Sequence, residues 1–355
     1  MSDGCPKCDE YKEKGYQFCG VCGRNLGDAG SEGPRPDPGC GCSSQNAEPE
    51  KTGLGFIALI LLAATVFIIF VAVFETIVLV WNFSDVFGFL PGGMYPAFLL
   101  VPSLHVLFYW EGLAFQIYWI FLAGVILSCV TTAIMRFIDA ARAPGGIMKP
   151  GAAEGTAAFW VCVFICAATA INLIIIAIVV LTGGEIIVPP LGSRLEEMFA
   201  LANASVWEEL ITRVLYIGVP MMFISLIVTR KKESLKCIFG GFGMSTTALV
   251  FILISAAIFG IGHYSGWYDQ AWKVVSVGIM GVFLGYLFVR FGLYAAILYH
   301  FVTDYLQAFE WMGVGGFLGV LEFMFIGVGF IALIYILMRL INSKKAIESL
   351  PLLHK

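Results

Sequence analysis

The stretch LGFIALILLAATVFIIFVAVFETIVLVW, residues 54–81, is apolar along almost its whole length, and Glu75 is its one ionisable side chain. A helix needs roughly 20 consecutive, mostly apolar residues to cross the hydrocarbon core of a bilayer. This segment meets that requirement, and comparable segments follow at 113–136, 156–182, 196–229, 245–262, 272–290, 292–312 and 316–341. The sequence therefore predicts an all-α fold, a polytopic membrane bundle of about eight transmembrane helices.

The composition of the whole chain agrees with a lipid environment. Of the 355 residues, 59% are hydrophobic and only 13% are charged, whereas soluble domains carry about 25% charged residues. We therefore expect most of the chain to contact the lipid bilayer. The net charge of −4 is too small to imply a polyanionic partner, and no nucleic acid is expected because no basic cluster has interleaved aromatic residues.

Two apolar segments depart from a simple spanning helix. Residues 95–110 are too few to span the bilayer and contain two prolines and a histidine, which predicts a re-entrant or interfacial piece. Residues 196–229 are too many for one straight span, and Pro220 is the candidate break in that helix. Gly281 and Gly285 form a pair of small residues four apart, a pattern typical of close helix packing in membranes.

The distribution of basic residues predicts the orientation in the membrane. The chain begins with MSDGCPKCDEYKEK, which has no apolar core of a signal peptide. If about eight spans are counted, all basic clusters fall on one side, which the positive-inside rule makes cytoplasmic. These clusters are Arg136, Arg142 and Lys149; Arg230, Lys231, Lys232 and Lys236; and Arg339, Lys344, Lys345 and Lys355. We expect a multi-pass protein of the cell membrane with both termini in the cytoplasm.

A cysteine module precedes the apolar segments. Cys5 and Cys8, and then Cys19 and Cys22, form two CxxC pairs within residues 1–26. Four thiolates from two tight turns can bind one tetrahedral Zn²⁺, and a site filled by four sulfurs is structural rather than catalytic. The pattern predicts a zinc ribbon, which could bind a cytoplasmic protein partner. The alternative is four free thiols in a disordered tail.

The remaining chain divides by composition. Residues 27–53 are rich in Gly and Pro, which is typical of a flexible linker. Cys40 and Cys42 lie in this linker and are interpreted as free thiols, because a second metal site would need further ligands. The membrane-embedded domain is predicted at 54–341, and a cytoplasmic tail at 342–355.

Ionisable residues inside apolar helices are costly and usually mark function. In the run WEELITR, Glu209 and Arg213 are spaced i,i+4, so they share a helix face and can pair. Glu208 points about 100° away and is left without that partner. One carboxylate is thus predicted to be neutralised and the other to be kept for chemistry. The alternative is an amphipathic helix end at the membrane surface.

Two more motifs carry histidines in separate apolar helices. In FGIGH, Phe259 and His263 are spaced i,i+4, and in HFVTD, His300 and Asp304 have the same spacing. Taken alone, each histidine could be structural, and the His300 pair could simply hold two helices together. The other buried-looking ionisable residues are Glu75, His105, Glu111, Glu310 and Glu322. Most of them lie near predicted segment ends, where interfacial placement explains them, while Glu322 fits this explanation least and has no assigned role.

The three motifs EExxxR, FxxxH and HxxxD, in this order on separate apolar helices, resemble those of the CAAX protease and bacteriocin-processing (CPBP) family of intramembrane proteases, which includes the CAAX prenyl endopeptidases. The stretch RFGLYAAILYHFVTD resembles the family's segment around its last motif. The resemblance covers residues 196–305 by motif and 54–341 by helix count. It implies an intramembrane endopeptidase that acts on a membrane-associated protein or peptide substrate. Prenylated CAAX-type proteins are one such class of substrate.

The resemblance also implies catalytic roles. Glu208 would activate a water, His263 would help hold that water, and His300 with Asp304 would stabilise the oxyanion. The physical chemistry agrees, because a carboxylate in an apolar pocket becomes a competent general base near neutral pH. An oxyanion needs oriented donors, which an imidazole can supply.

Glu209 and Arg213 would pair and fix their helix, whereas Asp304 departs from the family pattern. Many members have Asn at this position, and a carboxylate cannot donate a hydrogen bond as Asn does. Asp304 is therefore protonated, or orients His300, or joins a catalytic metal site. The family has been described both as metalloprotease and as glutamate protease. The chain has no HExxH helix, and we favour the glutamate-type site over a catalytic Zn²⁺.

Two other classes of function are compatible with part of the sequence. Buried charges could form a proton or ion path of a transporter, although all three motifs lie in the second half and no repeated halves are visible. A non-catalytic anchor or adaptor could use the zinc ribbon to bind its partner.

Overall fold

The computed structural model describes most of the membrane domain. The described residues are 54–101, 103–149, 151–187, 192–229, 232–266 and 270–348. The chain divides into two units, residues 1–51 and 52–355, and every described residue belongs to the second. Two predictions lie outside the described residues and stay predictions: the zinc ribbon of Cys5, Cys8, Cys19 and Cys22, and the linker thiols Cys40 and Cys42.

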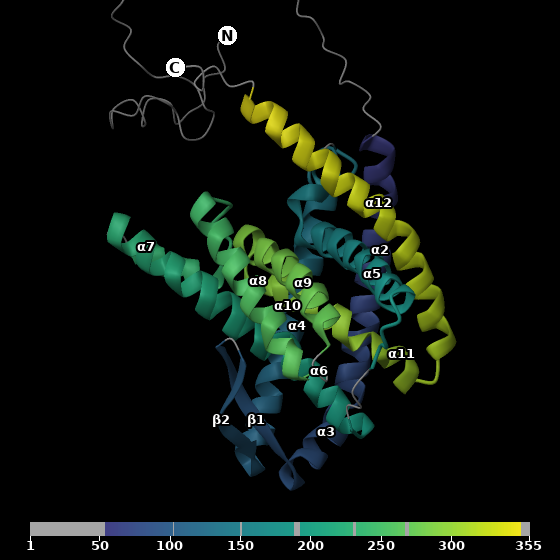
Figure 1. Cartoon of the computed structure of the whole chain (residues 1–355), viewed down its shortest axis with the longest axis vertical. Helices are drawn as coiled ribbons and strands as arrows, with labels where there is room; N and C mark the ends of the chain where they lie inside the picture. Colours follow the sequence, from purple (N-terminus) through teal and green to yellow (C-terminus); the bar gives the residue numbers. More distant parts are fainter. Residues whose placement is uncertain are drawn as a thin grey trace, which may run out of the picture. The chain divides into compact units, whose positions relative to one another are not determined.

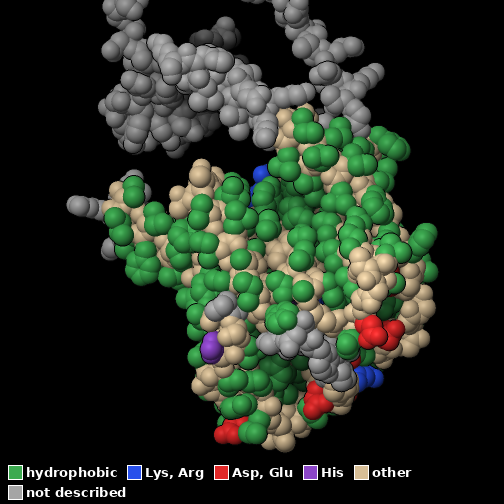
Figure 2. All heavy atoms as spheres, in the orientation of Figure 1, with side chains coloured by type: hydrophobic (Ala, Val, Ile, Leu, Met, Phe, Trp, Pro, Cys, Tyr) green, Lys and Arg blue, Asp and Glu red, His purple; other side chains and the backbone are tan. Residues whose placement is uncertain are grey.

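Long apolar helices form most of this unit (Figure 1). They are α2 (Leu54–Trp81), α4 (Gly112–Arg142), α5 (Ala157–Leu181), α8 (Thr246–Gly266), α9 (Ala271–Phe291), α12 (Gly315–Glu348) and the continuous run of α6 (Arg194–Glu209), η3 (Leu210–Gly218) and α7 (Val219–Thr229). The described residues thus contain 7 helices long and apolar enough to cross a membrane. Hydrophobic side chains dominate the face drawn in Figure 2, where acidic side chains are visible only over the lower part. The prediction of a helical, multi-pass membrane protein is confirmed.

The segment 292–312 does not form an eighth long helix. It contains α10 (Leu293–Asp304), the 3-10 turn η5 (Tyr305–Gln307) and the short α11 (Ala308–Trp311). Gly292, at φ 108°, separates α10 from α9. A helix of 12 residues rises only about 18 Å, less than the ~30 Å of a hydrocarbon core. The described residues thus contain 7 candidate spanning helices, against the about eight predicted.

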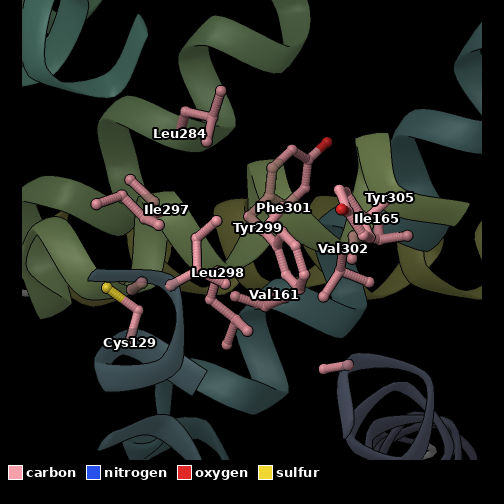
Figure 3. Close-up of a cluster of buried hydrophobic side chains, with 14 of the residues drawn as sticks. Cys129, Val161, Ile165, Leu284, Ile297, Leu298, Tyr299, Phe301, Val302 and Tyr305 are labelled. Carbon is pink, nitrogen blue, oxygen red and sulfur yellow. The ribbon is translucent and has the colours of Figure 1, made fainter. Parts of the chain in front are cut away.

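Helix α10 is apolar because it lies inside the bundle. Every residue from Ala295 to Val302 is buried, as expected for a helix that is hydrophobic all round. Figure 3 shows its side chains among those of α4, α5 and α9, with Val161 and Ile165 of α5 next to Tyr299 and Val302. This central position allows α10 to present its polar residues to several helices.

The segment 95–110 forms an antiparallel β-hairpin, a secondary structure that the apolar pattern did not indicate. Strand β1 covers Met94–Val101 and β2 covers Ser103–Glu111. The short helices α3 (Phe83–Phe89) and η1 (Leu90–Gly92) connect it to α2. Its β-branched and aromatic residues favour strands, and α4 begins directly after β2 (Figure 1).

Pro220 does not break the long helix after α6. The chain continues from Arg194 to Thr229, and the irregular part is the π-helical η3, which ends just before the proline. A proline leaves the carbonyl four residues earlier without its helical partner, here that of Tyr216. The wider turn of η3 accommodates this missing bond.

Close contacts between backbones hold the helices together. A Cβ atom on Gly281 would lie 2.9 Å from Ala256 Cα, and one on Gly285 would lie 2.8 Å from Ile252 Cγ2. The predicted close packing of these glycines is therefore present, between α9 and α8. Gly329 makes the corresponding contact between α12 and α5, where a Cβ atom would lie 2.2 Å from the carbonyl oxygen of Cys166.

The two ends of the described chain lie at the same end of the bundle. Helix α2 begins and α12 ends at the top of Figure 1. The short segment η2 (Ala153–Gly155) follows Lys149, and η4 (Lys232–Phe239) contains Lys232 and Lys236 of the second basic cluster. Helix α12 continues to Glu348, beyond the candidate span Gly315–Asn342, and the cytoplasmic tail at 342–355 stays a prediction. The cytoplasmic side stays a prediction from the basic residues.

Candidate active site

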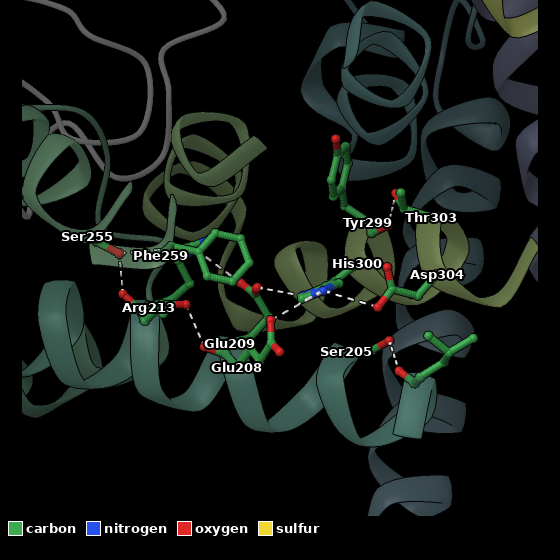
Figure 4. Close-up of polar contacts among 12 residues, drawn as sticks. Ser205, Glu208, Glu209, Arg213, Ser255, Phe259, Tyr299, His300, Thr303 and Asp304 are labelled. Carbon is green, nitrogen blue, oxygen red and sulfur yellow. Dashed lines mark hydrogen bonds and ion pairs between the residues drawn. The ribbon is translucent and has the colours of Figure 1, made fainter. Parts of the chain in front are cut away.

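The six ionisable residues singled out from the sequence come together in one cluster. Glu208 and Glu209 end α6, Arg213 lies in η3, His263 lies near the end of α8, and His300 and Asp304 lie on α10. The elements pack against one another inside the bundle, and Figure 4 shows most of the side chains pointing toward a common centre. The π-helical η3 begins directly after Glu209, and such irregular turns occur often at functional sites.

Glu209 and Arg213 form the buried base of the cluster. Arg213 Nε lies 3.1 Å from Glu209 Oε2, and neither side chain is exposed. Arg213 Nη1 donates to Ser255 Oγ at 2.9 Å, and Ser255 Oγ donates to the carbonyl oxygen of Thr212. The predicted i,i+4 pair is therefore present. Both side chains are completely buried in the protein.

His300 connects this base to the rest of the site. Its Nδ1 donates to Glu209 Oε1 at 2.9 Å, and its Nε2 lies 3.3 Å from Asp304 Oδ2. Carboxylate oxygens only accept hydrogen bonds, so an imidazolium with a hydrogen on each nitrogen satisfies both neighbours. The sequence indicated the contact with Asp304 but not the one with Glu209, because those residues lie far apart along the chain.

Glu208 occupies the more open side of the cluster. Its Oε2 lies 3.7 Å from His263 Nε2 and 3.9 Å from His300 Nε2. The side chain is 12% exposed, yet Oε2 itself is buried and has no hydrogen-bond partner among the described residues. The two glutamates therefore have different surroundings, as predicted: Glu209 is paired with Arg213, and Glu208 is not.

The FxxxH motif fixes the orientation of His263. His263 Nδ1 donates to the carbonyl oxygen of Phe259 at 2.8 Å, so the neutral ring presents an unprotonated Nε2 toward Glu208. The Phe259 ring lies 4.8 Å from the His263 ring and 6.0 Å from the His300 ring. Arg213 lies over the same ring, with Cζ 4.9 Å from its centroid. Phe259 thus contacts Arg213 of the buried ion pair and both histidines of the site.

The β-hairpin forms a wall next to these residues, which sequence reasoning missed. Trp207 Nε1 donates to the carbonyl oxygen of Phe98 at 2.8 Å, and the Tyr216 hydroxyl donates to the carbonyl oxygen of Leu100. The side chain of Leu100 packs against Gly262, where a Cβ atom would lie 2.7 Å from Leu100 Cδ2. The hairpin therefore contacts the immediate chain neighbours of both Glu208 and His263.

Two further ionisable residues lie near the cluster. Burial raises the pKa of the Tyr95 hydroxyl on β1 to about 12, and the charge of Glu208 adds to this effect. Lys273, in the first turn of α9, interacts electrostatically with Asp304 and Glu208. Neither residue belongs to a motif of recognisable spacing, so only the tertiary structure could identify them.

The interfacial placement predicted for the other ionisable residues is wrong for Glu75. Its side chain is completely buried, and neither carboxyl oxygen has a hydrogen-bond partner among the described residues. The position is inside α2, which extends beyond it to Trp81. The rest of this group is exposed: His105, Glu111, Glu310 and Glu322.

The described residues give no direct support for a catalytic metal. They contain no group of three or more His, Cys, Asp or Glu side chains arranged to hold a metal ion. A zinc protease site needs three protein ligands directed at one point. The choice between a catalytic Zn²⁺ bound by the two histidines and a carboxylate and a glutamate-type site stays a prediction from the sequence.

The fold and the cluster define a polytopic helical membrane protein with a buried carboxylate–histidine site. Residues 192–306 match the model of the family described as type II CAAX prenyl endopeptidase Rce1-like. The matched segment contains all six residues of the cluster, and it agrees with the resemblance over residues 196–305. The match supports an enzyme of the CAAX protease type. Comparisons with curated proteins and with solved structures find no match.

Proposed function

We propose that this protein is an intramembrane endopeptidase that hydrolyses a peptide bond with a water molecule activated by Glu208. The observation that carries the proposal is the carboxylate of Glu208, whose buried Oε2 lacks a hydrogen-bond partner in the described chain and faces the Nε2 atoms of His263 and His300. A buried polar atom without a partner is costly. A water molecule between Glu208 and the imidazoles would satisfy it.

The orientation of His263 suits this water. Because Nδ1 of the neutral ring donates to Phe259, Nε2 accepts a hydrogen from the water, while Glu208 Oε2 accepts the other. A lone pair of the water oxygen then remains free to attack a carbonyl carbon. This arrangement holds the nucleophile and its base together before the substrate arrives.

In the proposed reaction, Glu208 first accepts a proton and later donates it. Glu208 takes a proton from the water as the water oxygen bonds to the peptide carbonyl carbon, and the carbonyl oxygen becomes an oxyanion. When the carbon–nitrogen bond breaks, Glu208 returns the proton to the leaving amine. The products are a carboxyl group and an amine, and the site is restored.

His300 is proposed as the group that stabilises the oxyanion. As an imidazolium it places a positive charge 3.9 Å from Glu208 Oε2, next to the position of the proposed water. Asp304 is assigned the role of orienting this ring, since its Oδ2 lies 3.3 Å from Nε2. Such orientation accounts for an Asp where the family resemblance would favour Asn.

The substrate is proposed to be a membrane-associated protein of the prenylated CAAX type. The support is the description of the matched family, which names CAAX prenyl endopeptidases, together with a site built inside helices that can span a membrane. The structural zinc of the ribbon, held by Cys5, Cys8, Cys19 and Cys22, remains a separate proposal from the paired CxxC spacing.

Replacement of Glu208 by Gln tests the reaction. Gln keeps the volume but cannot accept a proton, so cleavage of a fluorogenic prenylated CAAX peptide by the protein in liposomes should fall by about 10²–10⁴-fold. Glu322→Gln is the matched control, because Glu322 is exposed on α12, and its activity should equal that of the wild type. Cleavage by Glu208→Gln at the wild-type rate, in protein with an unchanged Tm, would exclude the proposed base.

A further inference from the structure

The outer edge of strand β1 is hydrogen-bonded to side chains of the helical run that carries Glu208. Trp207 and Tyr216 bind the carbonyl oxygens of Phe98 and Leu100. These carbonyl groups must therefore point away from β2. On a strand, the N–H and C=O of one residue point to the same side. Phe98 and Leu100 thus direct their backbone groups toward the helices, and their neighbours on β1 pair with β2.

The register then identifies the residues at the free edge. Leu104 lies opposite Leu100, and Val106 lies opposite Phe98. In an antiparallel pair of strands, some directly opposite residues form no backbone hydrogen bonds with each other. Both residues of such a pair direct their N–H and C=O groups away from the partner strand. The N–H and C=O of Leu104 and Val106 therefore point away from β1. In the described chain the sheet has only these two strands, so no described strand pairs with this edge.

The position of the hairpin makes an uncovered edge unfavourable. Phe98 and Leu100 contact Trp207 and Tyr216, which lie well inside the candidate span Arg194–Val228. Open sheet edges facing lipid do not occur at membrane depth, because each unpaired backbone group there costs several kcal/mol. The side chains around the edge are apolar and exposed, with Val106 46% and Leu107 55% accessible. A partner with its own backbone groups must cover this edge, or water must reach it.

The edge is also continuous with the proposed active site. Both strands pack against α8, which ends at Gly266, shortly after His263, and Leu100 packs against Gly262. Figure 1 shows the hairpin beside the helices that carry the site residues. A protease needs its substrate in an extended conformation, because the carbonyl carbon must be accessible. An edge strand holds a peptide in that conformation through alternate backbone hydrogen bonds.

We propose that the free edge of β2 binds an extended segment of the substrate as an added strand and leads it to Glu208. The inference rests on the proposed endopeptidase function. The occupant is a peptide backbone with apolar side chains, which matches the exposed Leu104, Val106, Leu107, Phe108 and Tyr109. Backbone bonding at the edge supplies affinity with little dependence on sequence, and the apolar side chains favour a membrane-associated peptide.

The test compares Val106→Pro with Val106→Ala in the full-length protein in liposomes. Both variants lose the valine side chain, but only proline loses the outward N–H, and proline is tolerated at an outward edge position. The probe is a fluorogenic prenylated CAAX peptide extended on its amino side. Val106→Pro should raise KM by about fivefold over Val106→Ala, the effect of one net hydrogen bond, with kcat unchanged. Equal KM values for the two variants would overturn the proposal.

A second measurement applies if Val106→Pro does not fold. A photoreactive benzophenone residue is placed at 106 in the Glu208→Gln background, and at Phe323, which is 81% exposed on α12, as the control. Crosslinking of the labelled peptide at 106 but not at 323, competed by unlabelled peptide, is expected. No crosslink at 106 overturns strand addition and favours a hydrated edge. If the wild type does not cleave the probe, the endopeptidase proposal itself fails. Failure of that proposal is thus distinguished from failure of strand addition, in which the wild type cleaves the probe but no crosslink forms at 106.

Discussion

The residue-scale logic of the site is a division of roles between two adjacent glutamates. Glu209 forms an ion pair with Arg213 through Oε2 and a hydrogen bond with His300 through Oε1. Glu208 points to the other side of the helix, where its Oε2 faces His263 and His300 at longer distances and has no hydrogen-bond partner in the described chain. A helix turns about 100° per residue, so two neighbouring residues can be placed in two environments. The Glu209 carboxylate thereby has a structural role in the ion pair, and the Glu208 carboxylate remains available for proton transfer.

Loss of Arg213 should destabilise the protein more than loss of Glu208. Arg213→Met removes the guanidinium that faces Glu209 Oε2 and leaves His300 as the remaining partner of this buried carboxylate, which should cost about 3–5 kcal/mol, the range for breaking a buried pair. The double variant Glu209→Gln/Arg213→Met should recover most of that loss, because no buried charge remains unpaired. Chemical unfolding in detergent measures both. A single variant as stable as the wild type would contradict the ion pair described here.

Asp304 should tolerate Asn better than Ala. If Asp304 orients His300, Asn retains an oxygen that can accept from the ring, and kcat should stay within about tenfold of the wild type. Asp304→Ala leaves the ring without this partner, and kcat should fall by roughly 10²-fold, the range for one group that stabilises the oxyanion. Steady-state kinetics separate kcat from KM. Equal activities of Asn and Ala would argue against an orienting role.

At the scale of elements, the site depends on helices that approach more closely than ordinary side chains allow. Gly281 and Gly285 bring α9 against α8, the helix of His263. Gly329 brings α12 against α5, which in turn packs around α10. Small residues at such contacts replace the hydrophobic driving force that is missing between helices in lipid. The positions of His263 and His300 are therefore set by packing outside the polar cluster.

Two glycines on α12 allow a matched test of this packing. Gly329→Ala places a Cβ atom 2.2 Å from the Cys166 carbonyl oxygen and should destabilise the protein by about 1–3 kcal/mol. A Cβ atom on Gly327 would meet nothing within 4 Å, so Gly327→Ala should be neutral or slightly stabilising through helix propensity. Thermal inactivation in detergent gives the comparison. Equal midpoints for the two variants would show that α12 does not pack on α5 in this way.

At the scale of the whole molecule, the six residues of the cluster come from residues 208–304, within the matched segment 192–306. The chain also carries α2, α4 and α5, which pack against α10, and α12, which packs against α5 and α2. The cysteine module belongs to the separate unit of residues 1–51. Catalysis as proposed uses protons and side chains of the membrane domain. It needs no contribution from the metal expected in the ribbon.

Chelation of metal should therefore leave peptide cleavage intact. Treatment of the full-length protein with 1,10-phenanthroline should release the zinc of the ribbon, measured by a colorimetric indicator, while cleavage of the prenylated peptide in liposomes continues at the untreated rate. The cysteine variant Cys5→Ser/Cys8→Ser serves as a control without a ribbon site. Loss of cleavage in both proteins, restored by added Zn²⁺, would contradict a site that works through Glu208 and the histidines alone.

The sequence by itself determined the environment of the chain and most of the chemistry of its site. Long apolar segments require lipid and helices, and i,i+4 spacing already places Glu209 with Arg213 and His300 with Asp304, since those contacts depend only on helix geometry. Only the tertiary structure decided that α10 is a short helix buried in the core, that 95–110 is a hairpin, and that His300 contacts Glu209. An apolar pattern is the same for a helix in lipid, a buried helix and a buried strand, and contacts between distant segments depend on how the helices pack.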